Sequence, residues 1–242
     1  RDGYQLSLSG WKQSNKTNTT RAKWAAVFGN GLNNELLVGY SAIRDIRDLS
    51  NRIPLLLIGG DRPGTTIAAG ADRFSQGNQL NQDIYEITDN LTFDMGAHRI
   101  TVGTHNEFFK FFNVFTAGSY GIYSFKNVDS LIGGNPNRYE ILYGTPTKPA
   151  GAIADFNVRQ YGFYAQDAWS PSDRLTFTLG IRADLPNVDK PVTNPGLLDS
   201  LGVNTGVSPN GKLWSPRFGV NWDPRGDGKT VMLGLQNERE WV

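Results

Sequence analysis

Two histidines are the first candidates for proton transfer or metal binding in this chain of 242 residues. His98 and His105 are seven positions apart, so in one extended strand they point to opposite faces and cannot bind the same metal ion. The sequence contains no cysteine, which excludes thiolate ligands, disulfides and a cysteine nucleophile. We therefore predict no metal site and assign His98, close to Gly96, to a structural role in a turn.

Carboxylates and serines offer no better active site. Asp89 with Asp94, or Glu238 with Glu240, have the residue types of a glycosidase pair, but chance surface carboxylates explain them as well. Ser119 lies in Gly118-Ser-Tyr-Gly121, which lacks the spacing of a nucleophile elbow. We predict that the chain is not an enzyme and has neither catalytic residues nor a cofactor.

Two glycine-rich segments also resemble ligand-binding loops without completing them. Gly29-Asn-Gly31 lacks the third glycine of a dinucleotide fingerprint, and no helical pattern follows it. Residues 223–229 lack the alternating oxygen ligands and distal glutamate of a calcium loop. Both segments predict turns between strands.

Charged residues on the polar faces of predicted strands are the remaining chemical signal. They are Arg159, Arg174, Arg182, Asp184, Arg217 and Asp223. Such a row can guide an anionic solute or hold an inner segment. It can also form cross-strand ion pairs that fix register, which is the interpretation that we favour. The aromatic residues between Phe108 and Phe125 leave two alternatives open, a ligand platform and ordinary loop packing.

The elements that position these residues are strands. Apolar and polar residues alternate without exception from Arg174 to Asp184, and again from Trp214 to Asp223, which is typical of strands with one apolar and one polar face. Weaker patterns predict strands over residues 4–11, 22–28, 35–45, 83–94, 99–109, 156–169 and 230–235.

Composition supports an all-β class. The chain has 28 glycines, 12% aromatic residues and only 19% charged residues, which is typical of strands joined by turns. Its net charge of +1 argues against a nucleic-acid partner. No apolar stretch approaches the roughly 18 residues of a spanning helix, whereas a spanning strand needs only about 9–11.

The predicted connections alternate between short and long. Short turns are expected at 29–34, 95–98, 170–173 and 224–229, and long segments at 46–82, 113–155 and 187–213. In an antiparallel meander this places short and long connections at opposite ends, as in outer-membrane barrels. We predict an all-β antiparallel meander of about eight or nine strands, part of a transmembrane outer-membrane β-barrel, with residues 1–242 as a single barrel segment.

In this fold, one face of the sheet contacts lipid and the other lines the lumen. The predicted lipid-facing residues are Leu175, Phe177, Leu179, Ile181, Phe218 and Val220, and the six charged residues above are predicted to face the lumen. Trp169, Trp214 and Trp222 are predicted to form an interfacial aromatic girdle. Eight residues of strand span about 26 Å, or about 20 Å along the normal after tilting, against an apolar band of about 25 Å. The alternative is that these tryptophans belong to the core of a soluble sheet.

Three hairpins resemble those of TonB-dependent receptors. The first has Tyr161-Gly-Phe-Tyr-Ala-Gln-Asp-Ala-Trp169, a short turn, and then Leu-Thr-Phe-Thr-Leu-Gly-Ile-Arg182. The second begins with Trp214-Ser-Pro-Arg-Phe-Gly219, and the third, from Asn90 to Gly103, contains a Gly-x-His turn. Together they resemble the Oar-like subgroup over about residues 83–110 and 156–232.

The resemblance implies a receptor or transporter of the Gram-negative outer membrane. Its partners would be outer-membrane lipid, a plug domain, TonB and a solute that the sequence does not identify. We see no signal peptide, plug motif or TonB box, and the last residues lose the alternation, so we expect an internal fragment of a larger barrel. The alternatives are a complete eight-stranded outer-membrane barrel and a soluble β-sandwich that binds carbohydrate through exposed aromatic residues.

Overall fold

The computed structural model describes residues 3–5, 9–29, 31–59, 65–143, 153–226 and 232–237, the first and last of these ranges by their backbone alone. The chain divides into two compact units. Unit 1 comprises residues 1–18, 42–83 and 111–156, and unit 2 comprises residues 19–41, 84–110 and 157–242. The division cuts across the long strands, and each unit is described by itself.

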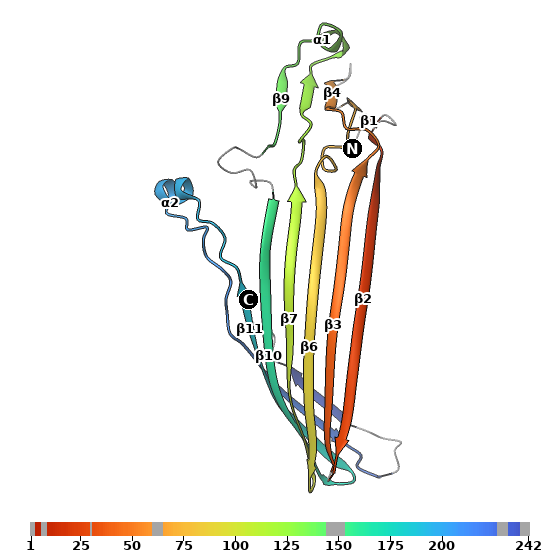
Figure 1. Ribbon diagram of the computed structural model, residues 1–242, viewed down its shortest axis with the longest axis vertical. Coiled ribbons are helices and arrows are strands. Elements are labelled where there is room, and N and C mark those ends of the chain that lie inside the picture. Colours follow the sequence, from red (N-terminus) through yellow and green to blue (C-terminus); the bar gives the residue numbers. More distant parts are fainter. Residues whose placement is uncertain are drawn as a thin grey trace. The chain divides into compact units, whose positions relative to one another are not determined.

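Eight strands form one sheet (Figure 1). They are β2 (Trp11–Phe28), β3 (Leu32–Leu49), β6 (Asn78–Met95), β7 (His98–Phe115), β10 (Ile153–Ser172), β11 (Leu175–Val188), β12 (Leu213–Trp222) and β13 (Met232–Asn237). The order in the sheet is β13-β12-β11-β10-β7-β6-β3-β2, so strands that follow one another in this set are neighbours. Within the described part, β2 and β13 do not pair and the sheet stays open. The predicted meander of eight or nine strands is confirmed.

Short turns join these strands in unit 2, where the sequence predicts them. Residues 96–97 connect β6 to β7, and residues 173–174 connect β10 to β11. Gly31 and Gly96 have φ of 82° and 62°, a left-handed conformation that glycine adopts without strain. In the connection after β12, the side chain of Asp223 accepts hydrogen bonds from the backbone N–H groups of Arg225 and Gly226. Residues 227–229 of that predicted turn lie outside the described residues.

The long connections are more ordered than predicted. In unit 1 they contain β4 (Leu55–Gly59), β5 (Thr66–Ala69), β8 (Ile122–Phe125), β9 (Arg138–Glu140) and the helix α1 (Val128–Ile132). With β1 (Gly3–Gln5), these strands form a second sheet in the order β1-β5-β4-β8-β9, in which β1 with β5 and β4 with β8 are parallel pairs. The prediction of one strand over residues 4–11 is wrong, because β1 ends at Gln5 and Trp11 begins β2. In unit 2 the connection after β11 contains the helix α2 (Pro195–Leu201).

The two units differ in what they bury. The buried apolar residues are Leu55, Ile58, Ala71, Ile122 and Phe125, all in unit 1. Among its described residues, unit 2 has no buried apolar side chain. A soluble domain must bury the apolar face of its sheet against another layer, so the alternative of a soluble β-sandwich is wrong for this unit.

Neither helix in the described residues has the length and hydropathy that a membrane span requires.

Candidate functional site on the polar face of unit 2

The register of β10, β11 and β12 sorts the side chains of unit 2 onto two faces. Gln166, Gly180 and Arg217 are directly opposite one another on the three strands, and so are Tyr164, Arg182 and Ser215. Between these rows, Ala165, Ile181 and Pro216 form a row that points the other way. The uninterrupted alternation in the sequence therefore becomes one polar face and one apolar face.

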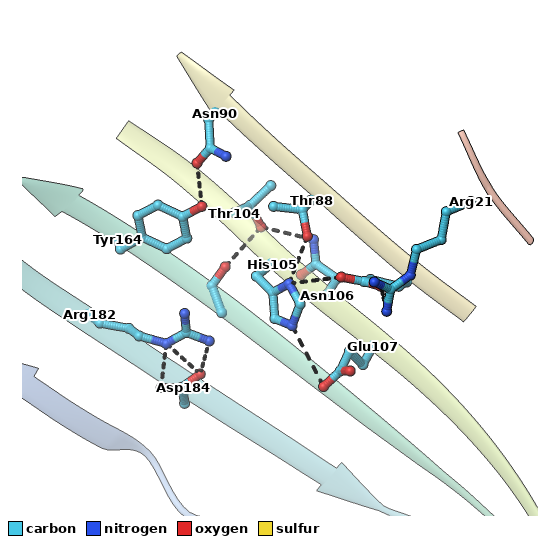
Figure 2. A network of polar contacts seen from close by, with 12 residues as sticks. Arg21, Thr88, Asn90, Thr104, His105, Asn106, Glu107, Tyr164, Arg182 and Asp184 are labelled. Carbon is cyan, nitrogen blue, oxygen red and sulfur yellow. Dashed lines mark hydrogen bonds and ion pairs between the residues drawn. The ribbon is translucent and has the colours of Figure 1, made fainter. Parts of the chain in front are cut away.

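A network of hydrogen bonds covers the polar face (Figure 2). Arg182 donates from Nε and Nη2 to the carboxylate of Asp184 at 2.8–3.0 Å. The guanidinium of Arg182 also lies 5.6 Å from the ring centroid of Tyr164, whose hydroxyl donates to Asn90. These contacts hold two large side chains in defined positions on neighbouring strands.

Ion pairs extend the network across β2, β3, β6 and β7. Arg21 contacts Glu86 at 3.2 Å, and Lys23 contacts Glu35 at 2.8 Å. His105 forms a 2.7 Å hydrogen bond with Thr88, and its ring nitrogens lie 3.9 Å from Glu86 and 3.7 Å from Glu107. In the described part of the chain, no group of three or more His, Cys, Asp or Glu side chains could hold a metal ion. Arg21 with Glu86 and Lys23 with Glu35 are cross-strand pairs of the kind that fixes register. Arg182 and Asp184, in contrast, pair within β11, so the predicted cross-strand pairing of the six charged residues stays a prediction.

Glycines on this face make room for the large polar side chains. A Cβ on Gly162 would lie 2.7 Å from Nη2 of Arg182 and 3.1 Å from Oδ1 of Asp184. A Cβ on Gly103 would lie 2.6 Å from both the Tyr164 ring and the Asn90 amide oxygen. The distances of 2.6–2.7 Å are shorter than real Cβ atoms show, so glycine at these two positions leaves room for the polar groups beside it.

A hollow of about 420 Å³ remains open on the polar face. It is lined by Thr88, His105, Tyr164, Ala165, Gln166, Gly180, Ile181, Arg182 and Arg217. Arg182 and Arg217, predicted from the sequence as parts of a charged wall, therefore meet at one site. Sequence analysis missed the others. The signal that could have found them is the position of Gly162 and Gly180 on the polar faces of two neighbouring strands.

The remaining charged residues do not join this site. Arg159 pairs with Asp189 at 3.2 Å, and alternation along β10 places it on the face of Tyr161 and Phe163. Its predicted grouping with Arg182 is therefore wrong, because the odd positions of β10 point away from the polar face. Arg174 lies in the turn between β10 and β11, and its carbonyl accepts a hydrogen bond from the N–H of Asp223. These two residues are thus part of the hairpin ends.

The opposite face of unit 2 carries exposed apolar side chains. Leu179 and Ile181 are 50% and 49% exposed, and Phe218, Trp214 and Trp222 are exposed as well. Leu175, Phe177 and Val220 are half-buried by their neighbours in the sheet. Contact of these residues with lipid remains a prediction.

Aromatic rings on this apolar face stack near the short turns. Trp169 stacks on Phe177 with ring centroids 5.5 Å apart and on His98 at 5.8 Å. His98 in turn forms a 2.7 Å hydrogen bond with Asp167. His98 therefore makes the structural contacts expected from the sequence, but it begins β7 and does not lie in the predicted turn. The girdle role of Trp169 remains a prediction.

The aromatic cluster between Phe108 and Phe125 is used for packing. In unit 2, Phe108 packs edge-on against Tyr161. In unit 1, Phe111 stacks on Phe156, Tyr123 lies 4.6 Å from Tyr139 between ring centroids, and Phe125 is buried. These contacts correspond to the loop-packing alternative.

An open antiparallel sheet with an apolar exposed face and an ion-paired polar face defines a wall of a membrane β-barrel. Residues 2–234 match the family model described as an outer membrane beta barrel domain, and the chain belongs to this family. The predicted fold class and outer-membrane location are thereby confirmed.

A solved structure supports the same fold. The crystal structure of the outer membrane transporter YddB from Escherichia coli superposes with a TM-score of 0.62 at 15% sequence identity. The alignment covers 97% of this chain and 26% of the transporter, so the chain spans about a quarter of that protein's length. No curated protein matches the sequence.

Proposed function

We propose that the chain is part of the barrel of a TonB-dependent, Oar-like receptor that captures or takes up a solute at the cell surface. The observation that carries the proposal is the contrast between the two faces of unit 2. One face exposes Leu179, Ile181 and Phe218, while the other holds the ion pairs and the hollow. A wall between lipid and a polar lumen needs these two faces.

The hairpins that resemble the receptor family coincide with strand pairs. Residues 161–182 lie in β10 and β11, and residues 90–103 lie in β6 and β7 with the Gly-x-His turn between them. The structural alignment supports a larger barrel, since this chain covers only 26% of a solved outer-membrane transporter. In such a barrel, the long connections would capture solute, and a plug domain would rearrange through TonB.

TonB dependence is tested with the full-length protein in its own host. The protein is tagged, and in-cell cross-linking followed by purification is compared between cells with and without TonB. We expect a cross-linked product that contains TonB and that increases when the medium supplies the solute. Absence of this product, with the receptor present in the outer membrane, would contradict the proposal.

A complete eight-stranded barrel is the second candidate, because the long sheet has eight strands, as the smallest outer-membrane barrels do. In such a closed barrel only β13 would separate β12 from β2, which puts their backbones about 10 Å apart. The chain has no native cysteine, so spin labels at Trp24→Cys and Phe218→Cys report this separation cleanly. A separation near 10 Å between labelled backbones supports the small barrel, and a much longer one supports the larger receptor barrel.

A further inference from the structure

The hollow on the polar face exists because Gly180 has no side chain. Gly180 is opposite Gln166 on β10 and opposite Arg217 on β12. The next row on the same face carries Tyr164 on β10 and Arg182 on β11. Across the sheet, the hollow extends to His105 on β7 and Thr88 on β6. It is therefore a depression bounded by long polar side chains on several strands.

The space above Gly180 is free of close contacts. A Cβ at this position would meet its nearest atoms, the carbonyl oxygen of Ala165 and Cγ of Gln166, at 3.6 Å, and Cβ of Arg217 at 3.7 Å. These are ordinary van der Waals distances, in contrast to the 2.6–2.7 Å found at Gly103 and Gly162. Packing of neighbouring side chains therefore does not require a glycine at position 180.

The charged side chains that line the hollow are both arginines, Arg182 and Arg217. Arg182 is paired with Asp184. Arg217 lines the hollow and is exposed, and it forms no ion pair with a residue that the structure describes. Arg182 uses Nε and Nη2 for Asp184, which leaves Nη1 as an additional donor.

We propose that this hollow binds a small organic anion carrying a carboxylate or phosphate group. Arg217 supplies the charge, and Nη1 of Arg182 and the amide of Gln166 supply further donors. Arginine is suited to this role because its planar fork matches the oxygens of both groups. A volume of about 420 Å³ accommodates a solute of several carbon atoms. The inference rests on the proposed function, since it names the class of solute that this receptor wall would contact.

The test measures citrate binding by calorimetry to the protein in nanodiscs of neutral phosphatidylcholine. Glucose serves as an uncharged solute of similar size, and inorganic phosphate as a second anion. We expect binding of citrate but not of glucose. Arg217→Gln should weaken citrate binding about 10- to 100-fold, because a charge-assisted hydrogen bond is lost. Arg217→Lys should weaken citrate binding less than Arg217→Gln.

Gly180→Val tests the hollow itself, since it fills the space without removing charge. It should reduce citrate binding at least as strongly as Arg217→Gln, and Gly180→Ala provides a smaller filling if the valine variant folds poorly. Thr178→Val, one row away on the same face of β11, and Arg174→Gln, in the turn, are matched controls that should bind citrate normally.

The proposal is overturned if neither citrate nor phosphate binds the folded wild-type protein, or if Gly180→Val and Arg217→Gln leave the affinity unchanged. Equal losses in Arg217→Gln and Arg174→Gln would also overturn it, because they indicate non-specific attraction. Failure of TonB cross-linking with intact citrate binding would reject only the proposed receptor cycle, so the two failures are distinguishable.

Discussion

Tyr164 on β10 lies across Gly103 on β7 so closely that a Cβ at position 103 would be 2.6 Å from ring carbon Cε2. The same Cβ would be 2.6 Å from the amide oxygen of Asn90, which accepts the hydrogen bond of the Tyr164 hydroxyl. Gly103→Ala must therefore displace one partner of this hydrogen bond. We expect it to lower the free energy of unfolding by about 1–3 kcal/mol.

The measurement is urea unfolding of the protein in detergent micelles, with Gly180→Ala as the matched control. Both positions are strand glycines on the polar face, but the nearest atoms to a Cβ at position 180 are 3.6 Å away. Alanine generally stabilises a strand relative to glycine, so Gly180→Ala should leave stability unchanged or raise it. Equal losses in the two variants would contradict the role assigned to Gly103.

Leu179 and Thr178 test which face meets the hydrocarbon. They are adjacent on β11 and point to opposite faces, where they are opposite Phe218 and Gly219 respectively. We expect Leu179→Arg to lower the free energy of unfolding in lipid vesicles by about 2–4 kcal/mol near the bilayer midplane. Thr178→Arg should cost much less, because its side chain would enter the polar lumen.

A second measurement of the same faces uses single cysteines at positions 178, 179, 180 and 181. Spin labels at positions 179 and 181 should collide mainly with oxygen dissolved in lipid, and labels at 178 and 180 mainly with a water-soluble nickel complex. Labels that show no alternation, or the reverse alternation, would refute the lipid-facing assignment of Leu179 and Ile181.

Asp189, directly after β11, gives the structure a defined acid response. Hydrogen bonds from the Asn157 side chain and backbone N–H, with a smaller contribution from Arg159, hold the pKa of its carboxyl below the ordinary value. A carboxyl with a lowered pKa stabilises the folded state at pH values above its unfolded pKa of about 3.9. This contribution disappears as the pH falls through the lower folded value.

We therefore expect acid to loosen the 157–189 contact only below about pH 4. The chemical shift of the Asp189 carboxyl carbon, followed by NMR during an acid titration, measures its pKa directly. Asn157→Ala should move that pKa upward, and Arg159→Gln should move it less, because the hydrogen bonds from Asn157 have the larger effect. A larger shift in the Arg159 variant would reverse this ranking.

The sequence predicts strands well where one face is apolar and the other polar. Residues 174–184 and 214–223 alternate without exception, and β11 and β12 occupy nearly the same positions. The first half of β2 was missed because Lys12 to Thr20 are polar on both faces, so pairing with β3 rather than periodicity makes it a strand. The small sheet was missed because its strands have three to five residues and depend on distant partners, such as Leu55 with Ile122.

The candidate site was predictable only in part, for a similar reason. Arg182 and Asp184 are two positions apart on one strand, so their shared face follows from the sequence. Arg217 lines the same hollow as His105 and Thr88 only because of the strand order and register of the sheet. Local sequence patterns do not determine that order or register. The charge of Arg159 predicts a lumen-facing position, but its odd position in the alternation of β10 places it on the other face.

The His98–Asp167 pair should behave asymmetrically when either partner is removed. Both residues belong to the apolar face, and one carboxylate oxygen of Asp167 is buried with no hydrogen-bond partner in the described structure. His98→Leu leaves this carboxylate unpaired and should lower the free energy of unfolding by about 1–3 kcal/mol. Asp167→Leu should cost less, because the remaining imidazole can still stack on Trp169.

The double variant His98→Leu with Asp167→Leu completes a thermodynamic cycle measured by urea unfolding in micelles. Because replacing both polar partners removes the unpaired group, the double variant should be more stable than His98→Leu alone. The face would then be continuously apolar around Trp169 and Phe177, as a lipid-exposed surface tolerates. Additive losses would show that the two side chains contribute independently, and the pair would then have no special role in stabilising this part of the wall.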